Sequence, residues 1–329
     1  MNLRSRLNRR KAQVFVLLTA LIASLILVPS WILPSFAATP KANVQFVSPD
    51  WVAANAKDPS LRVLDVRNAP LEYIAGHLPN AVNIADTAFR GPNGVLPVQY
   101  WDNDKLANLF AQSGVSSNNK VLVYSSGNDV LGATMVAYLM ERSGVKDVYV
   151  LDGGFAGYKA AGQTTTKVFP QYKVGNFNLK DNPAIRVSLD QVKQLIGKPG
   201  VTFIDPRPPE LFRGDRDIWV RNGHIPGARN IPWPTFTEAN NAQEDLKNPH
   251  KLKSLDEIRK LLAERGIKPS DDIIVTCSTG REATLQYLVL KHLLNYPKVR
   301  IYEGSWTEYS TTNLPVATGP EKTLTSDVR

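Results

Sequence analysis

The sequence predicts an α/β fold that is built twice, and two observations support this. Short apolar runs typical of buried parallel strands alternate with stretches whose apolar residues recur every three or four positions, as on the buried face of a helix. In addition, four short motifs occur twice in the same order, about 140 to 150 residues apart. That distance suits a duplicated domain and is much longer than the period of a solenoid repeat.

Each motif of the first half has a counterpart in the second half. In a fold of alternating strands and helices, functional loops gather at the carboxyl ends of the parallel strands. The pairs are Leu64–Arg67 with Ile204–Arg207, Gly76–Ile84 with Gly223–Ile231, Val121–Ser126 with Ile273–Ser278, and Val150–Phe155 with Ile301–Trp306.

The same patterns predict the individual elements. Ser188 and Ser254 stand before helical stretches, and Gln191 and Glu257 follow at the spacing of a capping box. The helical patterns include 131–142 and 285–294. The runs expected to form strands are 63–66, 121–124, 148–151, 202–204, 273–276 and 300–302.

Composition divides the chain into five segments. Residues 163–182 are rich in Gly, Thr and Lys and lack a strong period, so we expect a linker there. The first domain then occupies residues 40–162 and the second residues 183–316. Residues 317–329 form a tail, and residues 1–37 have the pattern of a targeting segment.

The targeting segment predicts export from the cytosol. Basic residues are followed by an apolar run from Val14 to Val28, and the small residues Ser35 and Ala37 fit a signal-peptidase cut after Ala37. A retained membrane anchor is the alternative, because the run extends to Leu33 and approaches the ~20 residues that span a bilayer. In both cases we expect the globular part in the periplasm or another extracytoplasmic compartment.

The net charge of +9 does not indicate binding to nucleic acid. Outside the targeting segment the positive charge is spread along the chain without a basic run, and no nucleic-acid module is recognisable. Five of the positive charges lie in the targeting segment, which has no acidic residue: Arg4, Arg6, Arg9, Arg10 and Lys11.

Cys277 is the only cysteine, so a disulfide within the chain is excluded. An odd thiol in an exported protein is either a reactive group or a small buried hydrophobe. Its position after an apolar strand and before a helix favours a nucleophile. One cysteine and scattered histidines do not predict a zinc site.

Together these motifs resemble those of the tandem-domain rhodanese family, which includes thiosulfate and 3-mercaptopyruvate sulfurtransferases. The resemblance covers residues 45–310 and rests on the Asp-x-Arg motif at 205–207, Gly-His-Ile-Pro-Gly-Ala at 223–228, the loop after Cys277, and Gly-Ser-Trp at 304–306. It implies two rhodanese-like domains, each a mostly parallel sheet flanked by helices. The first would lack the catalytic cysteine, because Ser125 takes its place.

The resemblance also implies an activity. A sulfurtransferase of this family moves sulfane sulfur from thiosulfate, or from 3-mercaptopyruvate, to cyanide or a thiol acceptor through a persulfide, here on Cys277. No cofactor is implied. The partners are therefore expected to be small molecules, with membrane attachment only if the N-terminal apolar segment is retained.

The loop after Cys277 suits this chemistry. Sulfur transfer needs a thiolate and then an anionic persulfide, and main-chain N–H groups at a helix N-terminus stabilise such anions. Gly280 can adopt a positive φ, and Arg281 is expected to dock the anionic donor. A cysteine phosphatase is excluded, because its arginine would stand where this chain has Ala283. The expected substrate-binding residues are Ser278, Thr279, Gly280, Arg281, Glu282, Ala283, Arg216 and Arg221.

Family members usually carry an arginine where this chain has Leu211. Arg213, Arg216 or Arg221 could take over its anion-binding role, with Arg216 and Arg221 as the candidates, or all three could be solvated charges. This departure and Ser125 motivate a second hypothesis. In it the chain is a non-catalytic binding or scaffold protein of the cell envelope that keeps the fold.

Other polar residues have structural interpretations. Asp205 and Arg207 are expected to form an ion pair that shapes the pocket. His77 and His224 recur in matching turns, including the turn of the cysteine-less half, so a structural role is favoured over that of a catalytic base. His250 and His292 are expected at the surface or in packing, and Trp219, Trp233 and Trp306 in the core or in the cleft wall.

Overall fold

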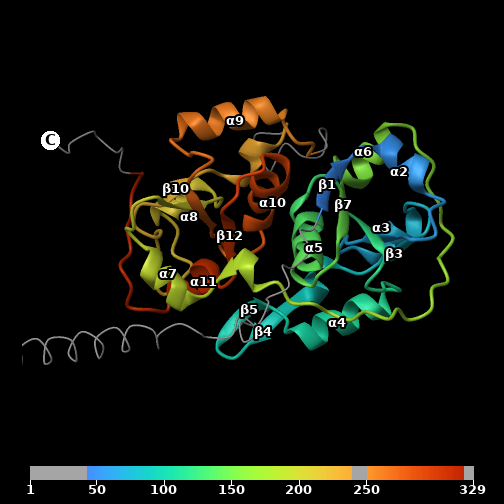
Figure 1. The fold of residues 1–329 in the computed structure, drawn as a ribbon, viewed down its shortest axis with the longest axis horizontal. Helices are drawn as coiled ribbons and strands as arrows, with labels where there is room; N and C mark the ends of the chain where they lie inside the picture. Colours follow the sequence, from blue (N-terminus) through green and yellow to red (C-terminus); the bar gives the residue numbers. More distant parts are fainter. Residues whose placement is uncertain (1–42, 239–249, 322–329) are drawn as a thin grey trace, which may run out of the picture. The chain divides into compact units, whose positions relative to one another are not determined.

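A computed structural model describes residues 43–238 and 250–321. The predicted targeting segment and the end of the tail lie outside these residues. Two five-stranded sheets are present, and every pairing within them is parallel. This confirms the predicted α/β fold of two similar domains (Figure 1).

The first sheet has the strand order β1-β7-β6-β2-β3. A two-stranded antiparallel hairpin, β4 and β5, is added after a short 3₁₀ helix at Asp86–Phe89. The helices are α2 (Pro49–Asn55), α3 (Pro70–Ala75), α4 (Asn103–Gln112), α5 (Leu131–Arg142) and α6 (Gly154–Ala160). The strands are β1 (Asn43–Val47), β2 (Leu61–Asp65), β3 (Ala81–Asn83), β4 (Arg90–Asn93), β5 (Leu96–Tyr100), β6 (Lys120–Tyr124) and β7 (Asp147–Leu151).

The second sheet repeats this order as β8-β12-β11-β9-β10, with 3₁₀ helices at Pro183–Ile185 and Trp233–Phe236. Its helices are α7 (Leu189–Leu195), α8 (Pro209–Arg213), α9 (Leu255–Glu264), α10 (Ala283–Leu288) and α11 (Ser305–Tyr309). Its strands are β8 (Arg186–Val187), β9 (Val201–Asp205), β10 (Arg229–Asn230), β11 (Asp272–Val275) and β12 (Val299–Tyr302).

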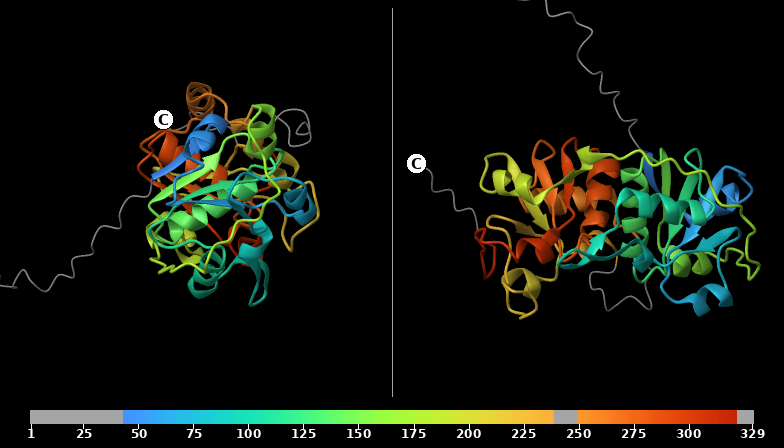
Figure 2. Two further views of the ribbon diagram at one scale, coloured as in Figure 1. Left: turned by 90° about the vertical axis from the view of Figure 1, so that its right-hand side faces the viewer. Right: turned by 90° about the horizontal axis from the view of Figure 1, so that it is seen from below.

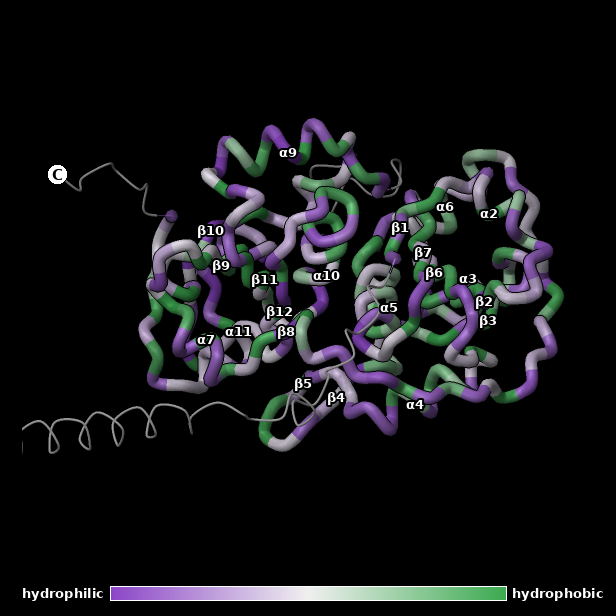
Figure 3. Tube along the Cα trace, viewed as in Figure 1, coloured by the Kyte–Doolittle hydropathy of each residue, from purple (hydrophilic) through white to green (hydrophobic). Residues whose placement is uncertain are grey.

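Local sequence explains the helix boundaries. Both predicted capping boxes are present: the Ser188 and Ser254 hydroxyls accept the N–H groups of Gln191 and Glu257, whose side chains accept in return. Along α9 hydrophobic and hydrophilic residues alternate (Figure 3), and the buried ones, Ile258 and Leu262, are four apart, so they share one face. Among the described residues no helix combines the length and apolar character needed to cross a bilayer.

The two halves share a helix–helix interface. Helices α5 and α10 lie side by side between the sheets (Figures 1 and 2), and the hydroxyls of Thr134 and Thr284 are 2.9 Å apart across it. The helix expected over 285–294 is divided: α10 ends at Leu288, and a π-helical turn spans Val289–Leu293. In this wider turn His292 Nε2 lies 2.9 Å from the carboxylate of Glu141 on α5.

The histidines predicted to be structural are buried and held by the main chain. Nδ1 of His77 lies 2.8 Å from the carbonyl of Tyr73, and Nδ1 of His224 lies 2.8 Å from that of Phe212. Each residue also forms an isolated antiparallel bridge, His77 with Thr166 and His224 with Ala317. These turns therefore fasten the segments that follow each domain: 166 in the linker and 317 in the tail.

Candidate active site

Cys277 lies in the loop between β11 and α10, at the carboxyl end of the central strand of the second sheet. The N–H of Gly280 donates to Cys277 Sγ at 3.1 Å. The N–H of Cys277 donates to the hydroxyl oxygen of Ser305 at 3.2 Å, and that oxygen lies 3.8 Å from Sγ. The loop therefore turns back on its own sulfur, as its sequence predicts.

Gly280 makes this tight turn feasible. Its φ is +86°, in the region that side-chain-bearing residues seldom adopt. A Cβ atom here would stand 3.0 Å from the carbonyl oxygen of Glu303 and 3.2 Å from the hydroxyl of Tyr100. Both the conformation and the space around this position therefore require glycine.

The first half of the chain contributes directly to the loop. Tyr100, at the end of β5, donates its hydroxyl to the carbonyl of Gly280 at 2.8 Å. Arg90, at the start of β4, donates to the hydroxyl of Thr279 at 3.1 Å. Neither residue was identified from the sequence, because nothing in a local pattern shows that a hairpin of one domain rests on the loop of the other.

Arg281 points toward acidic residues of the first half. Its Nε and one terminal nitrogen donate to Asp86 Oδ2 at 2.9 and 2.7 Å, and that terminal nitrogen also contacts Asp129. Burial lowers the pKa of the guanidinium, but Asp129 and Asp86 together raise it above its usual value. Two carboxylates therefore already balance its charge, and donor docking by Arg281 stays a prediction.

The other predicted arginines are in different settings. Arg221 donates to the main-chain carbonyls of Ser310 and Leu314 at 3.1 and 2.7 Å, so it fastens the segment after α11. Arg216 is exposed and makes no ion pair with the residues that the structure describes. Arg213 pairs with its neighbour Asp215. The structure therefore shows a packing role for Arg221 and leaves anion binding by these side chains a prediction.

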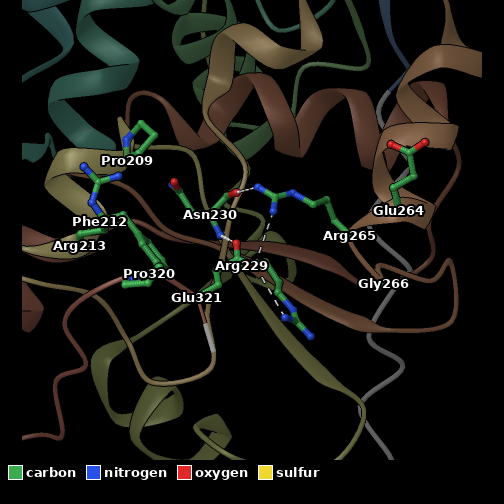
Figure 4. Close-up of a pocket in the computed structure, with 10 residues that line it drawn as sticks. All are labelled: Pro209, Phe212, Arg213, Arg229, Asn230, Glu264, Arg265, Gly266, Pro320 and Glu321. Atoms are coloured by element: carbon green, nitrogen blue, oxygen red, sulfur yellow. Dashed lines mark hydrogen bonds and ion pairs between the residues drawn. The ribbon is translucent and has the colours of Figure 1, made fainter. Parts of the chain in front are cut away.

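Arg213 lines a separate cavity of about 670 Å³ at the edge strand β10. Glu321 of the tail contacts Arg229 and Arg265 in this cavity, at 3.8 and 3.7 Å (Figure 4). The other carboxylate oxygen of Glu321 accepts the N–H of Asn230. Cys277 is not among the residues that line this cavity, and Glu321 of the tail already pairs with two of its arginines.

Asp205 and Arg207 form the expected ion pair, and both are buried. Nε and one terminal nitrogen of Arg207 bind the carboxylate, and the same terminal nitrogen donates to the carbonyl of Gly223 at 2.7 Å. The guanidinium carbon lies 4.9 Å from the ring centre of Trp306 and 5.5 Å from that of Trp219. The pair thus joins the end of β9 to the turn before His224 and to the aromatic wall.

The surroundings of Cys277 disfavour the thiolate form. Burial raises the pKa of Cys277 well above its usual value, and the Glu282 carboxylate beside it raises the pKa further. The N–H groups of Ala283 and Thr279 lower the pKa but do not offset these effects. Cys277 is only 1% exposed, so the residues around it enclose the sulfur.

Comparison with known proteins identifies the family of this chain. The family model described as a rhodanese-like domain matches residues 48–161 and again residues 188–312. The chain belongs to the rhodanese family. Both copies of the rhodanese domain are therefore present, and Cys277 lies in the second.

Several relatives match this chain over nearly their whole length. A protein of Synechococcus elongatus named "Putative thiosulfate sulfurtransferase" is 62% identical over 98% of this chain and 100% of its own length. The 3-mercaptopyruvate sulfurtransferase of Escherichia coli K12 is 30% identical over 82% of this chain and 97% of its own. The crystal structure of SseA from Escherichia coli has a TM-score of 0.70 at 29% identity, covering 79% of this chain and 98% of SseA.

The first rhodanese domain repeats the loop without its thiol. Phe155 and Ala156 donate their N–H groups to the carbonyls of Ser125 and Ser126 at 2.9 and 2.8 Å. Trp306 and Thr307 do the same for Cys277 and Ser278 at 2.9 and 3.1 Å. The main-chain hydrogen bonds of this loop are thus the same in the two domains, whereas the thiol is present only in the second.

A pair of glycine variants tests the role of the loop. Gly280→Ala and Gly227→Ala both place a side chain at a φ above +80°, but only position 280 also has close neighbours. We expect a similar cost of about 1 kcal/mol from the backbone in both. Labelling of the Cys277 thiol and sulfur transfer should fall at least tenfold in Gly280→Ala and stay within about twofold in Gly227→Ala. Equal activities would contradict the geometry described here.

Proposed function

We propose that this rhodanese transfers sulfane sulfur from thiosulfate to a small acceptor through a persulfide on Cys277, with 3-mercaptopyruvate as the alternative donor. The observation that carries this proposal is the single thiol enclosed by main-chain N–H groups, in a chain closely similar to proteins with sulfurtransferase names. The acceptor is cyanide or a thiol. The reaction is a nucleophilic exchange at sulfur and uses no redox cofactor.

The first half-reaction loads the enzyme. The Cys277 thiol loses its proton, and the thiolate attacks the outer sulfur of thiosulfate. A new S–S bond forms to Cys277, the S–S bond of thiosulfate breaks, and sulfite leaves with the electron pair. With 3-mercaptopyruvate, the C–S bond breaks in place of an S–S bond and pyruvate leaves after taking up a proton.

The second half-reaction unloads the enzyme. Cyanide or a thiolate attacks the outer sulfur of the persulfide, and the electron pair of the S–S bond returns to Cys277. Between the two steps the outer sulfur carries negative charge. Main-chain N–H groups of the loop before α10 stabilise that charge without any side-chain cation. A side-chain cation is not needed for this, since Arg281 pairs with Asp86 and Asp129.

The scaffold hypothesis has less support than the enzyme. Leu211, the departure that motivated it, is on the short helix α8, and Ser125 is in the first domain only. The thiol, the loop and the buried Asp205–Arg207 pair are all present in the second domain. We therefore assign catalysis to the second domain alone.

Persulfide formation tests the proposed function directly. After incubation with thiosulfate, the intact mass of the protein should rise by that of one sulfur atom, and a thiol or cyanide should reverse the gain. Cys277→Ser should show no gain, whereas Ser125→Ala should load like the wild type. Absence of loading with both thiosulfate and 3-mercaptopyruvate would exclude this function.

The raised pKa of Cys277 predicts a pH dependence. Only the thiolate attacks the donor, so the rate of the first half-reaction should rise with pH through neutrality and beyond pH 9. Glu282→Gln removes a negative charge beside the sulfur, lowers the pKa of the thiol and shifts the profile to lower pH. Stopped-flow measurement of sulfite release tests this, with the exposed Glu264→Gln as a matched control. A profile unchanged by Glu282→Gln would remove Glu282 from this role.

We also propose that the protein is exported, on the basis of the apolar run 14–28 and the small residues before position 38. Membrane attachment through the same run is the alternative. Expression of the full chain in a Gram-negative bacterium should give periplasmic protein whose N-terminal residue is Ala38. Membrane-bound protein with an intact N-terminus would identify an anchor, and protein confined to the cytosol would overturn export.

A further inference from the structure

We propose that the cysteine-less domain carries a second binding site, for a small oxyanion, at the place that corresponds to the Cys277 loop. A cavity of about 450 Å³ opens at the carboxyl ends of the first sheet. Ligand sites of proteins commonly have volumes in this range. Its polar and aromatic lining includes Arg67, Ser126, Asn128, Phe155, Lys159 and Thr165.

The cavity lies at the first-domain counterpart of the Cys277 loop. Arg67 follows β2 as Arg207 follows β9, and Ser126 follows the central strand as Ser278 does. Phe155 stands at the start of α6, where α11 has Trp306. The duplicated fold therefore places this cavity where the second domain has its cysteine loop.

Arg67 supplies a buried cation whose donors are only partly used. The side chain is 3% exposed, and its Nε and one terminal nitrogen bind Asp65. That terminal nitrogen also donates to the carbonyl of Gly76 at 2.9 Å. The other terminal nitrogen, NH1, has no hydrogen-bond partner within residues 43–238 and 250–321. Because Arg67 lines the cavity, these N–H donors are available to a ligand there.

A difference in loop length explains why this cleft is open. Arg207 and Gly223 are 16 positions apart, and their counterparts Arg67 and Gly76 are 9 apart. The additional residues of the second domain include Trp219, whose ring stacks beside Arg207 and whose indole N–H donates to Thr307 at 3.2 Å. The first domain has no residues at this place in the sequence, so Arg67 faces a cavity.

The chemistry of the lining selects the class of ligand. Lys159 is exposed and its ammonium lies 4.9 Å from the ring centre of Phe155, which also stacks on Arg67 at 4.0 Å. Ser126 donates its hydroxyl to Asn128 Oδ1, which leaves the amide nitrogen of Asn128 as the neutral donor. Glu72 is the one carboxylate of the lining and is solvent-exposed on α3. Asp65 balances the charge of Arg67, so Lys159 supplies the free positive charge among the lining residues, and with the Arg67 and Asn128 donors it suits a small oxyanion. A serine cannot take the sulfur of this anion, so the anion binds without reacting.

The test uses the protein with Cys277→Ser, in which thiosulfate cannot react at the catalytic loop. Thiosulfate is titrated while amide resonances are followed by NMR. We expect saturable shifts of the amides of Ser126, Asn128 and Ala156, separate from any shifts around position 277. Lys159→Glu should weaken this binding about tenfold, because it reverses the charge at the cavity.

Lys146→Glu is the matched control, because Lys146 is also exposed but directly precedes β7, at the amino ends of the parallel strands. It should leave the affinity unchanged. The proposal is overturned if the cleft amides show no saturable shift up to about 50 mM thiosulfate, a range that covers millimolar affinities. It is also overturned if both lysine variants weaken binding equally, since that result would indicate a general effect of net charge.

Discussion

The buried ion pair at the end of the second strand in each sheet is the interaction on which both clefts depend. Asp205 holds Arg207 by two nitrogens, and Arg207 in turn holds the carbonyl of Gly223. The first domain has the same arrangement with Asp65, Arg67 and Gly76. Removing one partner of such a pair leaves a buried charge, which costs about 3–5 kcal/mol. The position of each cleft wall is therefore fixed by a charge that has little freedom to move.

Two opposing effects act on the pKa of Cys277. Burial and the nearby Glu282 favour the neutral thiol, whereas main-chain N–H groups favour a negative sulfur. A protected thiol at rest is less open to oxidation than an exposed thiolate, because oxidation follows thiolate character and exposure. The main-chain N–H groups are the part of this environment that also stabilises the charge of a persulfide.

The sequence was sufficient for the fold, for the two capping boxes and for the loop around Cys277, because each is a short-range pattern. Contacts between the halves could not be predicted in this way. Arg281 looks like a free docking charge in sequence, yet its partners Asp86 and Asp129 are 195 and 152 positions away. Arg221 likewise looks available, although its donors are used by main-chain carbonyls about 90 positions along the chain. Only the three-dimensional packing, between the halves for Arg281 and within the second half for Arg221, reveals these partners.

The interface between α5 and α10 makes the two domains depend on one another for folding. All twelve residues of α5 are buried, and its Glu141 meets Tyr287 and His292 of the other half. A helix that is enclosed on every side cannot face water alone. Separating the two domains would expose α5 to water on the side that α10 now covers. The first domain is therefore needed to keep the chain folded, whichever domain carries the chemistry.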